Sequence, residues 1–223
     1  MPADNSDLAI RIENAAATGM QPGVWAELQP DRVAIYDYTG ADRTFRALNE
    51  NANRIVRLLR DAGLGRGDSV ALACSNRAEF CDVLLAALRG GMRLTPVNWH
   101  LTADEIAYIV RDCEARALFA DARIADTVQA AADACPGLVA KVAIGGRIPG
   151  FTPYETALEP YEGSNIPDPC RGYTMLYTSG TTGRPKGVHK PDAVYAPFNP
   201  DADRVHDVYL CTGPAYHAAP LAG

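Results

Sequence analysis

The stretch Ser69–Asn98, SVALACSNRAEFCDVLLAALRGGMRLTPVN, decides the fold. Residues 69–74 are small or apolar without alternation, which is typical of a strand buried on both faces. Residues 77–88 have helical spacing and end at Gly90-Gly91, and residues 93–97 predict a second strand. A strand, a helix and a strand in this order favour two parallel strands joined by a right-handed crossover. The helix side chains that we expect to face the core are Cys81, Leu84, Leu85 and Leu88.

The same alternation continues on both sides of this unit. Residues 33–38 predict a strand, and residues 45–62 predict a helix that begins after Thr44 and ends at Gly63. Further along, the capping box Thr102–Glu105 begins another helix. The remaining predicted elements are a strand at 117–120, a helix at 124–134 and a strand at 139–144. The alternation predicts the α/β class, with strands in a largely parallel sheet or sheets.

Residues 145–170 interrupt this pattern, because they hold five prolines and several acids. We interpret them as a surface connection with one short helix near residues 152–158, and we expect a strand again at residues 173–178. The chain is therefore expected to divide into a first α/β subdomain, residues 1–170, and the start of a second, residues 171–223.

Composition and charge limit the classes of protein to which the chain can belong. The chain has 223 residues, of which 48% are hydrophobic and 22% charged, as in ordinary globular domains. Its net charge of −6 argues against a nucleic-acid-binding surface but allows a local anion pocket. The N-terminus lacks a signal-peptide pattern, and the longest strongly apolar run, residues 83–88, is too short to cross a bilayer. We therefore expect a cytoplasmic protein without a transmembrane segment.

The cysteines and histidines predict neither disulfides nor a metal centre. None of the six cysteines forms a Cys-x-x-Cys pair, and several lie on predicted apolar faces, so reduced and buried thiols are expected. The four histidines lack the spacing of metal ligands, so we assign no metal-binding residue in this chain.

The segment Tyr177–Gly187, YTSGTTGRPKG, has the composition of a phosphate-binding loop. Its three glycines let the backbone approach a ligand closely, and its hydroxyl and amide groups can donate hydrogen bonds to phosphate oxygens. Arg184 and Lys186 add positive charge, and no carboxylate occurs between Asp168 and Asp192. A surface hairpin rich in Ser, Thr and Gly is the alternative interpretation of the same composition.

Two common nucleotide-binding motifs do not match this segment. A Walker A loop requires Ser or Thr directly after Gly-Lys, whereas Lys186 follows Pro185 and precedes Gly187. This mismatch disfavours a phosphate-loop kinase or ATPase. The dinucleotide fingerprint requires G-x-G-x-x-G, and Gly180, Gly183 and Gly187 lack that spacing.

The whole string Tyr177–Gly187 resembles the signature of the adenylate-forming, or AMP-binding, superfamily. This superfamily includes acyl-CoA synthetases, luciferases and peptide-synthetase adenylation domains. Further segments resemble other motifs of the family, namely residues 44–49 with 67–71, residues 96–98 with 105–106, and residues 213–220. The motifs near residues 96–99 and 213–220 are most similar to those of fatty acyl-CoA synthetases. The resemblance runs from about Trp25 to the last residue and implies an incomplete N-terminal domain of the adenylate-forming fold.

The resemblance implies an ATP-dependent acyl-CoA ligase. A fatty acid would attack the α-phosphorus of ATP, and the acyl-adenylate would then pass its acyl group to coenzyme A. ATP, Mg²⁺ and coenzyme A are the implied cofactors and co-substrates. The resemblance gives catalytic roles to Lys186 and His217, and it places Tyr216 and His217 at the acyl substrate. A core aromatic at Tyr216 and a partly buried histidine bonded to the backbone at His217 are the alternative interpretations. The implied phosphate-binding residues are Thr178, Ser179, Gly180, Thr181, Thr182, Gly183 and Lys186.

The sequence departs from the family pattern in two places. Pro191, Pro197 and Pro200 fall where the family has a helix, and proline breaks helices. The chain also ends at Gly223, before the family's Mg²⁺-holding acid, its ribose and adenine contacts and its C-terminal domain. The fragment is therefore expected to be inactive alone, and a truncated, non-catalytic nucleotide-binding or assembly protein is the alternative. The family's first domain can form dimers, which leaves a homodimer open.

Overall fold

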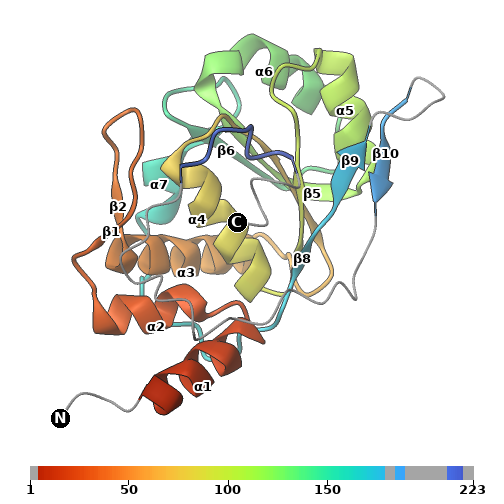
Figure 1. Ribbon diagram of the computed structural model, residues 1–223. Helices are drawn as coiled ribbons and strands as arrows, with labels where there is room; N and C mark the ends of the chain where they lie inside the picture. Colours follow the sequence, from red (N-terminus) through yellow and green to blue (C-terminus); the bar gives the residue numbers. More distant parts are fainter. Residues whose placement is uncertain (1–4, 179–183, 189–209, 218–223) are drawn as a thin grey trace.

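The computed structural model describes residues 5–178, 184–188 and 210–217. Its centre is a six-stranded sheet in which every neighbouring pair of strands is parallel (Figure 1). The strands, in the order β7-β6-β5-β3-β4-β8, are β7 (Thr152–Pro153), β6 (Ala140–Ile144), β5 (Ala115–Asp121), β3 (Ser69–Ala73), β4 (Arg93–Pro96) and β8 (Tyr173–Thr174). The predicted α/β class with a largely parallel sheet is confirmed.

Helices cover both faces of the sheet (Figure 1). The helices are α3 (Phe45–Asp61) and α4 (Ala78–Arg89) on one face, and α5 (Ala103–Asp112) and α6 (Ala125–Asp133) on the other. Val70 and Leu72 of β3 pack into the core formed with α3 and α4, whereas Ala71 and Ala73 pack into the core formed with α5 and α6. Because both faces of β3 are buried, its sequence is apolar without alternation.

Local capping groups begin and end the predicted helices. The Thr44 hydroxyl accepts a hydrogen bond from the Ala47 amide at 3.2 Å before α3. Thr102 and Glu105 form the predicted capping box before α5. Gly63 has a φ of 81°, the left-handed conformation that often follows a helix. These contacts satisfy backbone groups that helix ends leave free, which fixes where the helices start and stop.

The most deeply buried residues of helix α4 differ from those predicted. Its buried apolar residues are Ala78, Phe80, Val83, Ala86 and Ala87. The residues predicted to face inward are only half-buried, namely Cys81, Leu84, Leu85 and Leu88. The prediction is borne out in part, because Leu84 and Leu85 still pack against the core cluster. Helix α4 lies between the sheet and α3, and small side chains such as Ala86 and Ala87 permit close packing there, so the most deeply buried residues are not the leucines.

The N-terminal region adds two helices that the sequence pattern did not predict. They are α1 (Asn5–Ala16), which packs against α2 (Gln21–Leu28), and α2 in turn packs against α3. A separate hairpin follows, in which β1 (Val33–Ile35) pairs antiparallel with β2 (Arg43–Thr44). The predicted strand 33–38 is shorter than expected because Asp37 begins a turn, with its amide donating to the Asp42 carboxylate at 2.7 Å.

The last described strands lead away from the large sheet. The strand predicted at residues 173–178 is divided at Met175 into β8, which pairs with β4, and β9 (Leu176–Thr178), which pairs antiparallel with β10 (Lys186–Val188). The division into subdomains near residue 170 remains a prediction. The short helices η1 (Ala122–Ile124) and α7 (Tyr154–Leu158) complete the fold. Within the described ranges, no helix combines the length and the apolar character needed to cross a bilayer.

Candidate functional site

The predicted phosphate loop joins the two strands of a hairpin. In the pairing of β9 with β10, Thr178 lies opposite Lys186, and both residues are exposed. The strands therefore bring the two ends of the loop side by side, with a cation at one of them. The predicted loop residues outside the described ranges are Ser179, Gly180, Thr181, Thr182 and Gly183.

Contacts with α5 hold both arms of this hairpin. The Tyr108 hydroxyl donates to the Pro185 carbonyl at 3.3 Å, and the Arg184 guanidinium lies 5.6 Å from the centre of the Tyr108 ring. On the other arm, the Tyr177 hydroxyl donates to the Asp112 carboxylate at 2.5 Å. Burial and this hydrogen bond raise the pKa of Tyr177. Both arms of the hairpin are therefore anchored to α5, the helix that packs on the six-stranded sheet.

Tyr216 and His217 lie in a short segment at the carboxyl end of β3. The Asn76 side chain donates to the Gly213 carbonyl and accepts from the Ala215 amide, both at 2.8 Å. Tyr216 is half-buried and His217 is exposed, and their ring centres lie 4.7 Å apart. The structure thus brings the two predicted acyl-site residues together and ties them to the sheet through Asn76.

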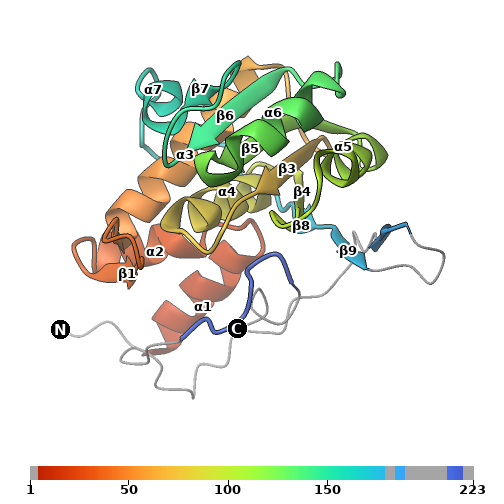
Figure 2. The ribbon, with the colours of Figure 1, turned by 90° about the horizontal axis from the view of Figure 1, so that it is seen from above.

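The two predicted groups of site residues lie apart. Figure 2 shows the β9–β10 hairpin projecting beyond β8, whereas residues 210–217, in dark blue, lie away from it. Among the described residues, no hydrogen bond or ring contact joins Thr178 or Lys186 to Tyr216 or His217. A ligand that contacts both groups must therefore be extended.

Asn76 was not among the residues predicted from the sequence. It follows a buried strand closely, and open α/β sheets bind ligands at the carboxyl ends of their strands. That position is the signal that could have identified it. Its partners, Gly213 and Ala215, lie 137 and 139 residues further along the chain, a separation that no local pattern bridges.

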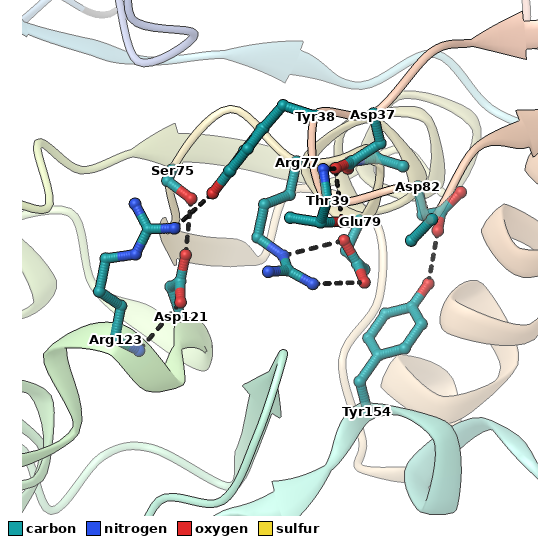
Figure 3. A network of polar contacts seen from close by, with 12 residues as sticks. Asp37, Tyr38, Thr39, Ser75, Arg77, Glu79, Asp82, Asp121, Arg123 and Tyr154 are labelled. Atoms are coloured by element: carbon teal, nitrogen blue, oxygen red, sulfur yellow. Dashed lines mark hydrogen bonds and ion pairs between the residues drawn. The ribbon is translucent and has the colours of Figure 1, made fainter.

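Polar groups of the protein itself join the carboxyl ends of β3 and β5 (Figure 3). The chain leaves β3 toward β4 and then crosses to β5 on the other side, which makes this the switch point of the sheet. The Ser75 hydroxyl donates to Asp121 at 2.6 Å, and Asp121 accepts from the Arg123 amide at 2.9 Å. Arg123 also donates to the Tyr38 hydroxyl and lies 5.6 Å from the Trp99 ring centre. These contacts occupy the place where other doubly wound sheets bind ligands.

A second polar cluster ties the β1–β2 hairpin to α4 (Figure 3). Asp82 is fully buried and accepts hydrogen bonds from Tyr154 at 2.8 Å and from Arg43 and Asn51 at 3.2 Å. Burial raises the pKa of Asp82 to about 6, although the charge of Arg43 opposes this rise. Because the carboxylate is out of reach of solvent, we assign this cluster to stability and not to ligand binding.

A surface hollow of about 320 Å³ opens between α2, α3 and residues 163–165. Its arginines already have partners, since Arg46 lies 3.2 Å from Asp31 and Arg54 lies 3.2 Å from Glu50. None of the predicted site residues lines this hollow. It therefore offers no free charge for an anionic ligand.

The implied Mg²⁺ has no evident ligands in the described part of the chain. Mg²⁺ is normally held by one or two carboxylates together with phosphate oxygens and water. Across residues 5–178, 184–188 and 210–217, no cluster of His, Cys, Asp and Glu could hold a metal ion. No step proposed below is therefore assigned to Mg²⁺.

Comparison with known proteins decides the family. Residues 24–223 match the family of AMP-binding enzymes. The chain belongs to the AMP-binding enzyme family. The resemblance carried by the Tyr177–Gly187 signature is therefore confirmed over nearly the whole chain.

Two relatives of this AMP-binding chain are named as ligases. The chain is 34% identical over 149 residues to the fatty acid–(acyl-carrier-protein) ligase ScoC of Streptomyces coeruleorubidus. The aligned region covers 67% of this chain and 28% of ScoC. The chain is also 31% identical over 195 residues to the long-chain-fatty-acid–CoA ligase FadD13 of Mycobacterium tuberculosis. That aligned region covers 82% of this chain and 37% of FadD13. The chain thus spans about a third of the length of these curated relatives.

Solved structures share the fold of this AMP-binding chain. The inhibitor-bound N-terminal domain of FACL13 from Mycobacterium tuberculosis aligns with a TM-score of 0.65 and 28% identity, over 78% of this chain and 44% of that one. A fatty acyl CoA synthetase from the same organism aligns with a TM-score of 0.63 and 26% identity, over 79% and 34% of the two chains. The parallel sheet and its helices are therefore the architecture of N-terminal domains in this family.

Proposed function

We propose that this chain supplies the triphosphate-binding loop and part of the acyl site of an ATP-dependent acid–CoA ligase. The observation that carries the proposal is the loop YTSGTTGRPKG on a hairpin whose exposed ends set Thr178 opposite Lys186. Membership of the AMP-binding enzymes supports an adenine nucleotide as the ligand. The names of ScoC and FadD13 support a fatty acid as the acid, and the name of FadD13 supports coenzyme A as the acceptor.

In the first step, the carboxylate of the acid attacks the α-phosphorus of ATP, and pyrophosphate leaves. One anion must approach another, so the site has to offset the negative charge of the β- and γ-phosphates. The amides and hydroxyls of residues 178–183, together with the Lys186 ammonium, donate hydrogen bonds to these oxygens and stabilise the leaving pyrophosphate. No covalent bond to the protein is needed.

Beside the α-phosphate, where the new bond forms, His217 and Tyr216 contact the acyl group. A neutral imidazole can donate one hydrogen bond to the carboxylate or to the adenylate. In the second step, the thiolate of coenzyme A attacks the carbonyl carbon of the acyl-adenylate, a thioester forms and AMP leaves. The half-buried Tyr216 ring, next to His217, lines the acyl group at this point.

The test compares loop variants of a full-length protein that contains this chain. Lys186→Ala with Thr181→Ala removes an ammonium and a hydroxyl donor together. Removal of one preorganised donor typically costs about 10²–10³-fold in rate, so we expect ATP–pyrophosphate exchange with a fatty acid to fall by at least about 100-fold. Unchanged exchange would remove the loop from the mechanism.

The matched control is Lys141→Ala with Thr152→Ala, which makes the same two substitutions at the β6–β7 edge of the sheet. Lys141 lies over the Phe151 ring, and β6 and β7 lie at the opposite edge of the sheet from β8, which leads into the β9–β10 hairpin, so exchange should match the wild type. The 223-residue chain by itself is expected to show no exchange, because it covers 37% of FadD13. Robust exchange by the chain alone would overturn that part of the proposal.

A further inference from the structure

We infer that Asn76 is a positioning residue for acyl-adenylate formation, because its side chain holds the segment that carries Tyr216 and His217. The role in acyl-adenylate formation rests on the proposed function, whereas the contacts of Asn76 with Gly213 and Ala215 are independent of it. The Asn76 Nδ2 donates to the Gly213 carbonyl, and the Oδ1 accepts from the Ala215 N–H, both at 2.8 Å. One side chain thus bonds two backbone groups, much as a neighbouring strand would.

The direction of Asn76 is itself fixed by its neighbours. The Ser75 hydroxyl bonds the Asp121 carboxylate at 2.6 Å, and both residues are buried. The Arg77 amide donates to the Ser75 carbonyl at 2.8 Å, which bends the chain around Asn76. The Arg77 guanidinium makes two hydrogen bonds of 3.2 Å to Glu79. Asn76 therefore projects from a turn that is held on both sides.

The segment that Asn76 holds is compact up to His217. The His217 amide donates to the Pro214 carbonyl at 3.0 Å, and Ala215 packs against the core cluster that contains Leu72. The position of His217 thus follows from that of the Asn76 carboxamide. Since a misplacement of about 1 Å can cost about 10²-fold in rate, a residue can control the reaction here without touching the substrate.

Only a carboxamide can make both bonds of Asn76. Aspartate could still accept from the Ala215 N–H, but it could not donate to the Gly213 carbonyl, and alanine would lose both bonds. Asn76 is exposed, so neither substitution opens a cavity in the core and the fold is expected to persist. Asn76→Ala and Asn76→Asp therefore separate loss of position from loss of fold.

Hydrogen exchange of the Ala215 amide in the 223-residue chain tests the positioning without any reaction. In Asn76→Ala, we expect this amide to exchange about 5-fold faster, while the amides of β3 keep their wild-type rates. The matched control is Asn98→Ala, because Asn98 follows the neighbouring strand and its side chain accepts from the His100 amide at 2.9 Å. The control should leave the Ala215 rate unchanged. An unchanged rate in Asn76→Ala would overturn the inference.

Kinetics of the full-length protein test the consequence for the reaction. In Asn76→Ala, kcat for ATP–pyrophosphate exchange should fall at least about 10-fold, with KM for ATP changed by less than about 2-fold, because the bonds of Asn76 go to Gly213 and Ala215 and not to the described residues of the β9–β10 hairpin. Asn76→Asp keeps one of the two bonds and should recover part of kcat. A wild-type kcat despite faster Ala215 exchange, or an equal loss in kcat and in ATP affinity, would contradict the inference. No exchange by the wild type would contradict the proposed function instead, and the Ala215 rate would still decide whether Asn76 holds the segment.

Discussion

Asp82 and Arg89 are two charged residues buried between α3 and α4. Asp82 has Arg43 at 3.2 Å as its counter-charge, whereas the Arg89 guanidinium bonds uncharged oxygens of Asn49 and Asn53. Burial lowers the pKa of Arg89 to about 10, which leaves it charged at neutral pH. The contact between these helices therefore depends on buried polar bonds as well as on apolar packing.

Asp82 is expected to make the stability of the chain depend on pH. Its pKa in the folded protein is about 6, above the ordinary value of 3.8. Between these values the folded state keeps the proton and the unfolded state has lost it, so the free energy of unfolding falls as the pH rises. The contribution of Asp82 is fully present below about pH 4 and is lost above about pH 6, a change of about 3 kcal/mol.

Urea unfolding of wild type and Asp82→Asn checks this prediction. On going from about pH 4 to about pH 7, the variant should gain about 3 kcal/mol of unfolding free energy relative to the wild type. The control is Asp133→Asn, which changes an exposed acid of α6 and should keep the wild-type dependence. A difference between Asp82→Asn and wild type that is the same at both pH values would contradict the assignment.

Among the elements, the connection that leads into β8 depends on Gly172. Its amide donates to the Leu88 carbonyl at 2.7 Å, and a Cβ at this position would lie 2.2 Å from the Met92 carbonyl oxygen. The Ala87 carbonyl oxygen of α4 would lie 2.4 Å from the same Cβ, and neither backbone oxygen can move aside without disturbing α4 or the chain that enters β4. We expect Gly172→Ala to lower the free energy of unfolding by about 1–3 kcal/mol or more, measured by urea unfolding.

Gly137→Ala is the control for this prediction, because a Cβ there would meet nothing within 4 Å. Its free energy of unfolding should stay within about 0.5 kcal/mol of the wild type. If the two alanine variants were equally stable, the close approach at Gly172 would not govern the placement of β8.

Elements with a local cause could be predicted from the sequence, and those with a tertiary cause could not. The starts of α3 and α5 were predicted because Thr44 and Thr102 cap them within three residues. Helix α2 was missed because Pro22 and Gly23 stand near its start and suggest a turn. The strand predicted at 173–178 is divided because β8 and β9 pair with different partners, which no local pattern records.

The residues of the candidate site likewise fall into those that a local motif predicts and those that only the folded chain brings together. The phosphate loop and the Tyr216–His217 pair belong to contiguous motifs, so their residues could be selected from the sequence. Asn76 could not, because its two bonds reach more than 130 residues along the chain. The anchoring of the hairpin to Tyr108 and Asp112 of α5 is equally a property of the folded chain.

Across the whole molecule, the distribution of charge favours a small polyanion as the ligand. The net charge is −6, yet the interval between Asp168 and Asp192 contains only basic charges. The basic residues in that interval are Arg171, Arg184, Lys186 and Lys190. A local positive region on an acidic protein suits a compact anion such as a triphosphate better than an extended nucleic acid.

The central claim is that residues 178–186 bind the β- and γ-phosphates of ATP. Because AMP lacks these phosphates, the most direct test is the Kd of ATP and of AMP for the full-length protein, as wild type and as Lys186→Ala with Thr181→Ala. We predict that the variant raises the Kd of ATP at least about 10-fold and leaves the Kd of AMP within about 2-fold. An unchanged Kd of ATP, or an equal weakening of ATP and AMP binding, would contradict the claim.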